Sequence, residues 1–163
     1  MNTFLPYADF MKSAQCLDNK RLGKQRVEAW QIYQTLKKGQ YRNCKCRCSE
    51  FFNGYCVGCY SKAKITAWHN HPAVKMWRGY EQALLRYGMS ICEEWKKRNY
   101  VDNMLGRFIE KYDITKDTGN PNWLNNKEFH SAMRSNLLRK NKEWYSKFCW
   151  EEKGDKPYIW PVK

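Results

Sequence analysis

The apolar residues of this chain recur at helical spacing, and this periodicity constrains the fold more than any other feature. Between residues 19 and 37, Leu22, Ala29, Tyr33 and Leu36 fall on one stripe, because residues three, four and seven apart share a face of a helix. The alternation of polar and apolar residues that is typical of a half-buried strand is nearly absent. The sequence therefore predicts an all-α fold.

Cap and stop residues place five predicted helices along the 163 residues, a length that favours one compact domain. One helix is expected to begin at Pro72, with Asn70 or His71 as its cap, and to end at Gly88. The others are expected near residues 9–17, 19–37, 89–99 and 127–141. Asp, Gly, Asn and Pro residues predict a loop over 112–126.

Residues 40–66 break the helical pattern and are expected to form a cysteine-rich insertion in a single domain, 1–163. Five of the eight cysteines lie there, as C-x-C-x-C followed by C-x-x-C: Cys44, Cys46, Cys48, Cys56 and Cys59. A C-x-x-C turn places two thiolates on one side of a tetrahedral ion, and structural zinc normally has four such ligands. We expect zinc bound by Cys56, Cys59 and two of the three upstream thiols, with His69 as a substitute ligand.

Two alternatives stay open for this cysteine cluster: a reactive or disulfide-forming group, and no site at all. Four protein ligands leave no open position for water, so the expected zinc is structural. Thiols clustered in this way favour a reducing compartment over a secreted disulfide scaffold. No apolar run approaches the ~20 residues that span a bilayer, and the N-terminus lacks the apolar stretch of a signal peptide. A soluble intracellular protein, not secreted, is therefore expected.

A strong excess of positive charge predicts a polyanionic partner. The chain has 30 Lys and Arg against 16 Asp and Glu, a formal net charge of +14. Aromatic residues make up 16% of the chain, with 8 Trp, and rings among cations suit nucleic acid because they stack on bases. Charge alone leaves DNA, RNA and an anionic membrane open, and core packing accounts for many of the rings.

The helix expected over 19–37 carries an unusual polar face. Arg21, Gln25 and Glu28 share this face, and Lys20 and Lys24 lie alongside it. A solvated face with weak ion pairs four residues apart would look the same. The spacing alone does not distinguish such a face from a binding or catalytic site.

Several stretches together resemble the pyrimidine-dimer DNA glycosylase (endonuclease V-like) family. They are MNTFLPY, DNKRLGKQRVEAW, NHPAVKMWRGYEQALLRYG, EEWKKRNY and FHSAMRSNLLRKNKEWYSKF. The most specific is NHPAVKMWRGYE, and the resemblance covers most of the chain apart from the cysteine insertion. It implies a compact all-α fold and an enzyme that cuts the glycosidic bond of a flipped-out nucleotide and then the DNA strand.

The resemblance also implies a mechanism. The α-amine of the N-terminal residue, Met1, or Asn2 once Met1 is removed, attacks C1′ to form an imine, and β-elimination follows. A free α-amine has a pKa of about 8, so a good fraction is nucleophilic at neutral pH. The Arg-Glu pair that assists in the family falls on Lys24 and Gln25, and a glutamine cannot transfer a proton. Glu28 is the preferred replacement and Asp18 the next, unless the chemistry is altered or lost.

Contacts with DNA are expected from cations and histidines between residues 20 and 134. The cations of the phosphate clamp and two histidines that could join it are Lys20, Arg21, Lys24, Arg26, His71, Lys75, Arg78, His130 and Arg134. His71 fits a family position at a helix entrance, although a helix cap needs no further role. His130 and Arg134, four residues apart, fit either a phosphate grip or an ordinary polar face.

Together these inferences predict a monomeric DNA glycosylase with abasic (AP) lyase activity. Its substrate would be a damaged or modified pyrimidine in double-stranded DNA, a pyrimidine dimer by the resemblance. One alternative is a non-catalytic nucleic-acid-binding protein that keeps the fold, which Gln25 favours. Another is a glycosylase for a different modified base, including one in RNA.

Overall fold

The computed structural model describes residues 2–37, 41–42, 51–52, 55–60, 64–65 and 67–162, and for residues 41–42, 51–52, 64–65 and 67 it describes only the backbone. The α-helices are α1 (Phe10–Cys16), α2 (Asn19–Lys37), α3 (Pro72–Lys75), α4 (Glu81–Lys97), α5 (Leu105–Lys111), α6 (Lys127–Lys140) and α7 (Lys142–Tyr145). Single turns of 3-10 helix, η1 to η4, span Ala67–Asn70, Ile114–Lys116, Asn122–Asn125 and Ser146–Phe148. The predominance of helix confirms the predicted all-α class.

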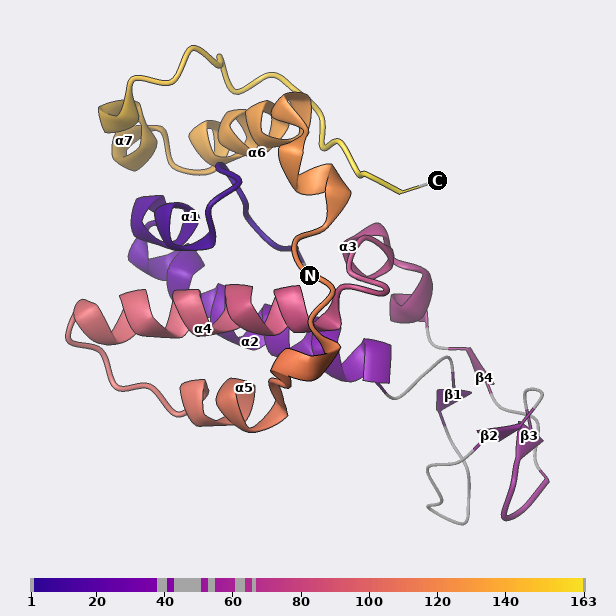
Figure 1. The fold of residues 1–163 in the computed structure, drawn as a ribbon. Coiled ribbons are helices and arrows are strands. Elements are labelled where there is room, and N and C mark those ends of the chain that lie inside the picture. The colour runs from indigo at the N-terminus through magenta and orange to yellow at the C-terminus, as the bar shows by residue number, and fades with distance from the viewer. Residues whose placement is uncertain are drawn as a thin grey trace.

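Helix α4 is the centre of the packing. It lies against α1, α2 and α5, while α6 and α7 pack together on the far side of α1 and the C-terminal tail runs back past them (Figure 1). Its residues Leu84, Leu85, Tyr87 and Ile91 are fully buried, and a fully buried side chain of this kind contributes about 1.5–3 kcal/mol. The core therefore fixes how α2 faces the rest of the chain.

The predicted boundary at Gly88 is wrong. The chain breaks earlier, after the short helix α3, where Gly79 adopts a left-handed φ of 78°. Helix α4 then runs without interruption through Gly88. A Cβ at this position would lie only 2.5 Å from Cζ of the buried Phe108. Gly88 is thus required by the close approach of α5, a tertiary contact, and does not end a helix.

Replacing Gly88 with alanine should destabilise the fold by about 1–3 kcal/mol, because the added methyl group overlaps the Phe108 ring in a packed core. The matched control is Gly106→Ala in α5, where no described atom lies within 4 Å of the added Cβ. That variant should gain about 0.5–1 kcal/mol from helix propensity. Urea unfolding measures both, and equal stability of the two variants would contradict this packing.

Four two-residue strands fall within the stretch for which the sequence predicts an insertion. They are β1 (Tyr41–Arg42), β2 (Phe51–Phe52), β3 (Tyr55–Cys56) and β4 (Lys64–Ile65). β1 pairs with β4 and β2 with β3, both antiparallel, and Figure 1 shows them beside the helices rather than among them. The division of the chain into a helical domain and an insertion stays a prediction.

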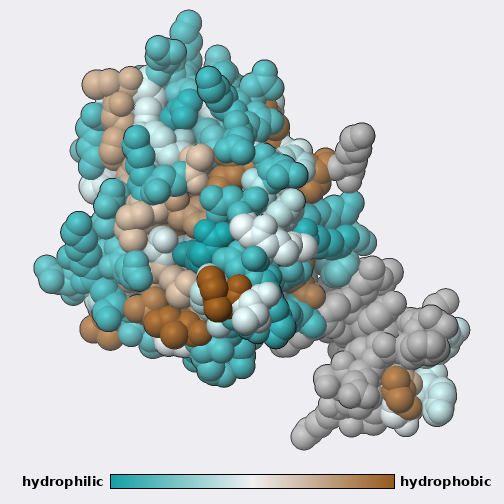
Figure 2. Space-filling view, viewed as in Figure 1, coloured by the Kyte–Doolittle hydropathy of each residue, from teal (hydrophilic) through white to brown (hydrophobic). Residues whose placement is uncertain are grey.

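The surface in Figure 2 is largely hydrophilic, with scattered apolar residues. None of the helices in the described ranges is both long enough and apolar enough to cross a membrane.

Candidate active site

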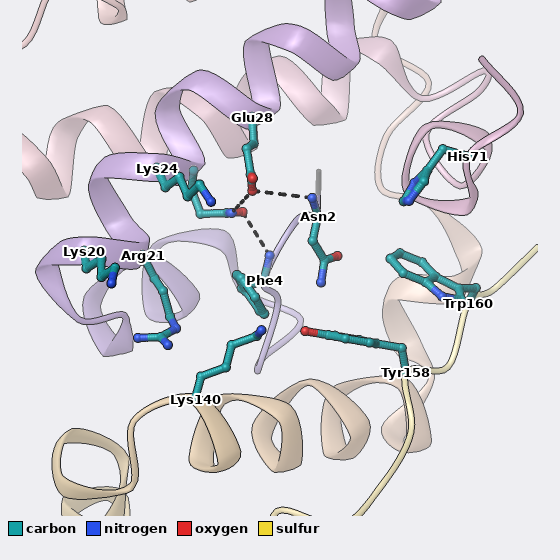
Figure 3. A pocket seen from close by; sticks show the side chains of 11 residues that line it. Asn2, Phe4, Lys20, Arg21, Lys24, Glu28, His71, Lys140, Tyr158 and Trp160 are labelled. Atoms are coloured by element: carbon teal, nitrogen blue, oxygen red, sulfur yellow. Dashed lines mark hydrogen bonds between the residues drawn. The ribbon is translucent and has the colours of Figure 1, made fainter. Parts of the chain in front are cut away.

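A cavity of about 440 Å³ opens where the N-terminal segment meets the first half of α2 (Figure 3). Segments far apart in the sequence supply its walls. The described lining residues are Asn2, Phe4, Lys20, Arg21, Lys24, Gln25, Glu28, His71, Lys140, Tyr158 and Trp160. The polar face that the sequence predicts for α2 therefore lines a cavity instead of facing open solvent.

The N-terminal segment is held in place by buried hydrogen bonds. The Phe4 N–H donates to Gln25 Oε1 over 3.0 Å, and the Phe4 carbonyl lies 3.1 Å from the Tyr87 hydroxyl. The Trp77 indole N–H donates to Thr3 Oγ1 over 3.1 Å. These bonds join residues 3 and 4 to α2, α4 and the turn between α3 and α4, and they hold the segment in place as a wall of the cavity.

Glu28 is the single acidic side chain in the described lining. Its Oε2 accepts a hydrogen bond from Gln25 Nε2 over 2.8 Å and one from the Asn2 backbone N–H over 3.4 Å. Figure 3 shows both interactions, with the carboxylate pointing toward the N-terminal segment. Of the two carboxylates that the sequence leaves open, Glu28 is the one beside the backbone of residue 2.

Asp18 lies at the start of α2, outside the described lining. Its carboxylate accepts from the Arg21 backbone N–H over 2.8 Å and forms an ion pair with the Arg21 guanidinium. Burial alone would raise the pKa of Asp18, but the hydrogen bonds from Arg21 and its positive charge lower that pKa below its ordinary value of 3.8. Asp18 is therefore a helix cap and ion-pair partner, two roles that keep it ionised.

Positive charge dominates the cavity, since Lys20, Arg21, Lys24 and Lys140 all line it. Lys140 is the last residue of α6, and its Nζ lies 5.9 Å from the centre of the Phe4 ring. Burial lowers the pKa of Lys140, and the charges of Arg21, Arg139 and Lys24 lower it further. Such mutual repulsion is relieved when an anion binds among the cations.

Aromatic rings form the opposite wall. The His71 ring packs between Trp68 and Trp160, with ring centres 5.3 and 5.9 Å apart, and Trp160 stacks on Tyr158 at 5.7 Å. His71 Nδ1 accepts from the Ala73 N–H over 3.1 Å as the cap of α3, which confirms the predicted cap. Because Nδ1 accepts, the neutral ring carries its proton on Nε2, and burial lowers the pKa of His71.

Two residues of α6 that are predicted to contact DNA hold the N-terminal segment in place. The buried His130 ring has Nδ1 2.7 Å from the Leu5 carbonyl and Nε2 2.7 Å from the Leu124 carbonyl. Arg134 donates to the Pro6 carbonyl over 3.0 Å and pairs with Glu152 at 2.7 Å. These contacts give both residues a structural role, and their contact with DNA stays a prediction.

Other members of the predicted clamp also lie outside the described lining. Arg26 pairs with Asp102 at 2.6 Å and lies over the Trp95 ring. Arg78 donates to the His69 carbonyl over 2.7 Å, and Lys75 is half-buried at the end of α3. The structure thus separates the α2 cations that reach the cavity, such as Lys20 and Lys24, from Arg26, which lies outside the described lining in an ion pair.

Met1 and three of the predicted zinc ligands, Cys44, Cys46 and Cys48, lie outside the described residues. Cys56 is buried at the start of a turn, and the Cys59 N–H donates to its Sγ over 3.4 Å. Within the described ranges, no group of three or more His, Cys, Asp or Glu side chains could hold a metal ion.

Four lining residues were not predicted from the sequence: Phe4, Lys140, Tyr158 and Trp160. The tail that carries the last two is tied to α6, since the Lys156 N–H donates to Ser135 Oγ over 2.9 Å and the Lys156 carbonyl accepts from Asn136 over 3.2 Å. The concentration of aromatic and basic residues toward the C-terminus is the one sequence feature that points to these lining residues. It does not indicate which of these residues lie close to α2 in the fold.

A comparison with protein-family models gives a match over about two thirds of the chain. Residues 1–107 match the family model described as pyrimidine dimer DNA glycosylase. Neither the curated proteins nor the solved structures contain a match. The matched region includes α2, Glu28 and His71, whereas Lys140, Tyr158 and Trp160 lie beyond it.

Proposed function

The chain belongs to the pyrimidine dimer DNA glycosylase family, and from this premise we propose that it is a monomeric glycosylase and AP lyase for a damaged or modified pyrimidine in double-stranded DNA. Family membership itself indicates a DNA glycosylase-type repair function and DNA as the partner. The observation that carries the finer proposal is the Glu28 carboxylate, 3.4 Å from the Asn2 backbone nitrogen in a cavity lined by cations.

The proposed reaction uses the free α-amine of the N-terminal residue as nucleophile. Its nitrogen forms a bond to C1′ as the glycosidic bond breaks, and the base leaves with the electron pair and takes up a proton. Opening of the sugar ring gives an imine, loss of a C2′ proton follows, and the 3′ phosphate departs. Glu28 stabilises the cationic sugar and carries protons between these steps.

The cavity suits a nucleotide turned out of the duplex. Its volume of about 440 Å³ falls within the ~300–1,000 Å³ usual for small-molecule sites. The Tyr158 and Trp160 rings offer stacking surfaces, and Lys20, Lys24 and Lys140 offer charge to the flanking phosphates. Turning out a base costs a few kcal/mol, least where pairing is already damaged, and this favours lesions over normal pairs.

Borohydride trapping tests the proposal directly. Protein is incubated with duplex DNA that carries one abasic site, and the imine is reduced to a stable covalent adduct. The expected result is an adduct at the N-terminal residue that disappears when the N-terminus is acetylated or extended. No adduct on duplex DNA or on an RNA analogue, together with tight binding to either and no release of a base from damaged duplex DNA, would instead support a non-catalytic nucleic-acid-binding protein.

Lys24→Ala and Lys140→Ala should each weaken DNA binding and reduce the slope of log K against log salt by about 1, because each removes one phosphate contact. Lys96→Ala, an exposed α4 position outside the described lining, is the matched control. Fluorescence anisotropy at several salt concentrations measures the slopes. Equal slopes for all three variants would show that the cavity cations do not meet phosphates.

We also propose that Cys56, Cys59 and two of Cys44, Cys46 and Cys48 bind one structural zinc ion. The turn supports this, because its Cys59 N–H points at Cys56 Sγ and Tyr60 continues with a left-handed φ of 54°. Such N–H groups stabilise a thiolate that binds metal. The spacing of the cysteines in the sequence predicts that the other two ligands come from Cys44, Cys46 and Cys48.

Metal analysis of protein purified under reducing conditions should find one zinc per chain. Cys56→Ser and Cys59→Ser should lower that content, whereas Cys149→Ser, an exposed cysteine near the C-terminus, should not. Protein that contains no zinc would overturn the assignment.

A further inference from the structure

Gln25 occupies the position where the family resemblance implies a glutamate, and it is fully buried. Its side-chain amide makes three hydrogen bonds. Oε1 lies 3.0 Å from the Phe4 N–H and 2.7 Å from the Tyr87 hydroxyl, and Nε2 lies 2.8 Å from Glu28 Oε2. One side chain thus connects the N-terminal segment, α4 and the cavity carboxylate.

These partners determine which way the amide faces. The Phe4 N–H is a donor, so it requires an acceptor. The Tyr87 oxygen lies near two acceptors, Gln25 Oε1 and the Phe4 carbonyl at 3.1 Å. Burial raises the pKa of Tyr87 well above its ordinary value of 10.0. The Tyr87 hydroxyl therefore keeps its proton and donates a hydrogen bond to these acceptors. If the Gln25 amide were flipped, its NH₂ group would face the Phe4 N–H and the Tyr87 hydroxyl, which are both donors, and its oxygen would face the Glu28 carboxylate.

We propose that Gln25 is a positioning residue that holds Glu28 as a hydrogen-bond acceptor beside the N-terminal backbone. A neutral amide can accept from two donors at one end and donate at the other, which a carboxylate cannot do. A glutamate at this position would place an oxygen where Nε2 now lies, and two carboxylates that close together cannot both be ionised. The inference rests on the proposed function for its catalytic meaning, but the placement of Glu28 can be measured without catalysis.

The test is Gln25→Glu. The variant keeps the acceptors for Phe4 and Tyr87, so it should fold, and the acidic limb of its kcat/KM profile should move to higher pH by about one unit or more. The matched control is Gln82→Glu, which buries a glutamate on α4 instead of α2, at a position where Gln82 Oε1 accepts from the Asp113 N–H over 2.9 Å. The control profile should not move.

A carbon-13 NMR titration of the Glu28 carboxyl in DNA-free protein separates this inference from the proposed function. In Gln25→Glu the titration midpoint should lie above that of the wild type, even if the wild type traps no abasic DNA. Should Gln25→Glu fail to fold, Gln25→Met fills the same space without donating, and it too should raise the midpoint. Wild-type midpoints in a folded Gln25 variant would overturn the positioning role, whatever the trapping result.

Discussion

Glu28→Gln should lower strand cleavage at an abasic site by about 10²–10⁴-fold, the usual contribution of a positioned acid or base. The substitution keeps the size of the side chain but removes the negative charge beside the Asn2 nitrogen. An amide neither takes up a proton nor stabilises a cationic sugar. Because one carboxylate is exchanged in a cavity that keeps its cations, DNA affinity should stay within a few-fold of the wild type.

Single-turnover cleavage and anisotropy measure the two quantities. Glu93→Gln, an exposed carboxylate of α4 outside this cavity, is the matched control and should cleave at the wild-type rate. Asp18→Asn tests the other carboxylate, and we expect reduced stability with cleavage largely retained. Normal cleavage by Glu28→Gln and loss of cleavage in a folded Asp18→Asn would assign the reaction to Asp18.

Arg98→Ala should destabilise the protein by about 3–5 kcal/mol, the cost of breaking a buried ion pair. Its guanidinium pairs with the buried Glu94 at 2.7 Å. It also donates to the Leu17 carbonyl over 2.7 Å and to Asn19 Oδ1 over 2.9 Å, at the junction of α1 and α2. Loss of Arg98 leaves a buried carboxylate and helix-end carbonyls without their donor.

Urea unfolding measures this change. The matched control is Arg107→Ala, an exposed arginine of α5, which should change stability by less than about 0.5 kcal/mol. A similarly small effect for Arg98→Ala would show that other contacts hold the junction. Because α2 begins at this junction and carries Gln25 and Glu28, a destabilised Arg98 variant should also lose activity on mild heating before the wild type does.

Local signals in the sequence were sufficient for several elements. The range 19–37 is predicted and observed for α2, because its apolar stripe is a feature of neighbouring residues. Pro72 and the His71 cap are likewise local, and both are confirmed. The predicted helix end at Gly88 is wrong, because this glycine is needed for the close approach of the Phe108 ring. That contact joins residues twenty positions apart, so no local sequence pattern indicates it.

The candidate site, too, could be predicted from the sequence only in part. The sequence indicated the cationic face of α2 and narrowed the carboxylate to Glu28 or Asp18. Tertiary structure separates them, since Asp18 pairs with Arg21 whereas Glu28 faces the Asn2 nitrogen. It also shows that Gln25, at the position where the family resemblance implies a glutamate, donates a hydrogen bond to Glu28.

The sequence by itself determined the helical class, the excess of positive charge, the family and the helix that carries the candidate site. Helix periodicity and charge are properties of neighbouring residues and of composition, and the chain carries them before it folds. Only the tertiary structure decided which charges reach the cavity and which, such as that of Arg26, lie outside it in an ion pair. Pairing and burial depend on segments far apart in the chain, as when Lys140 and Trp160 close a cavity opposite Glu28.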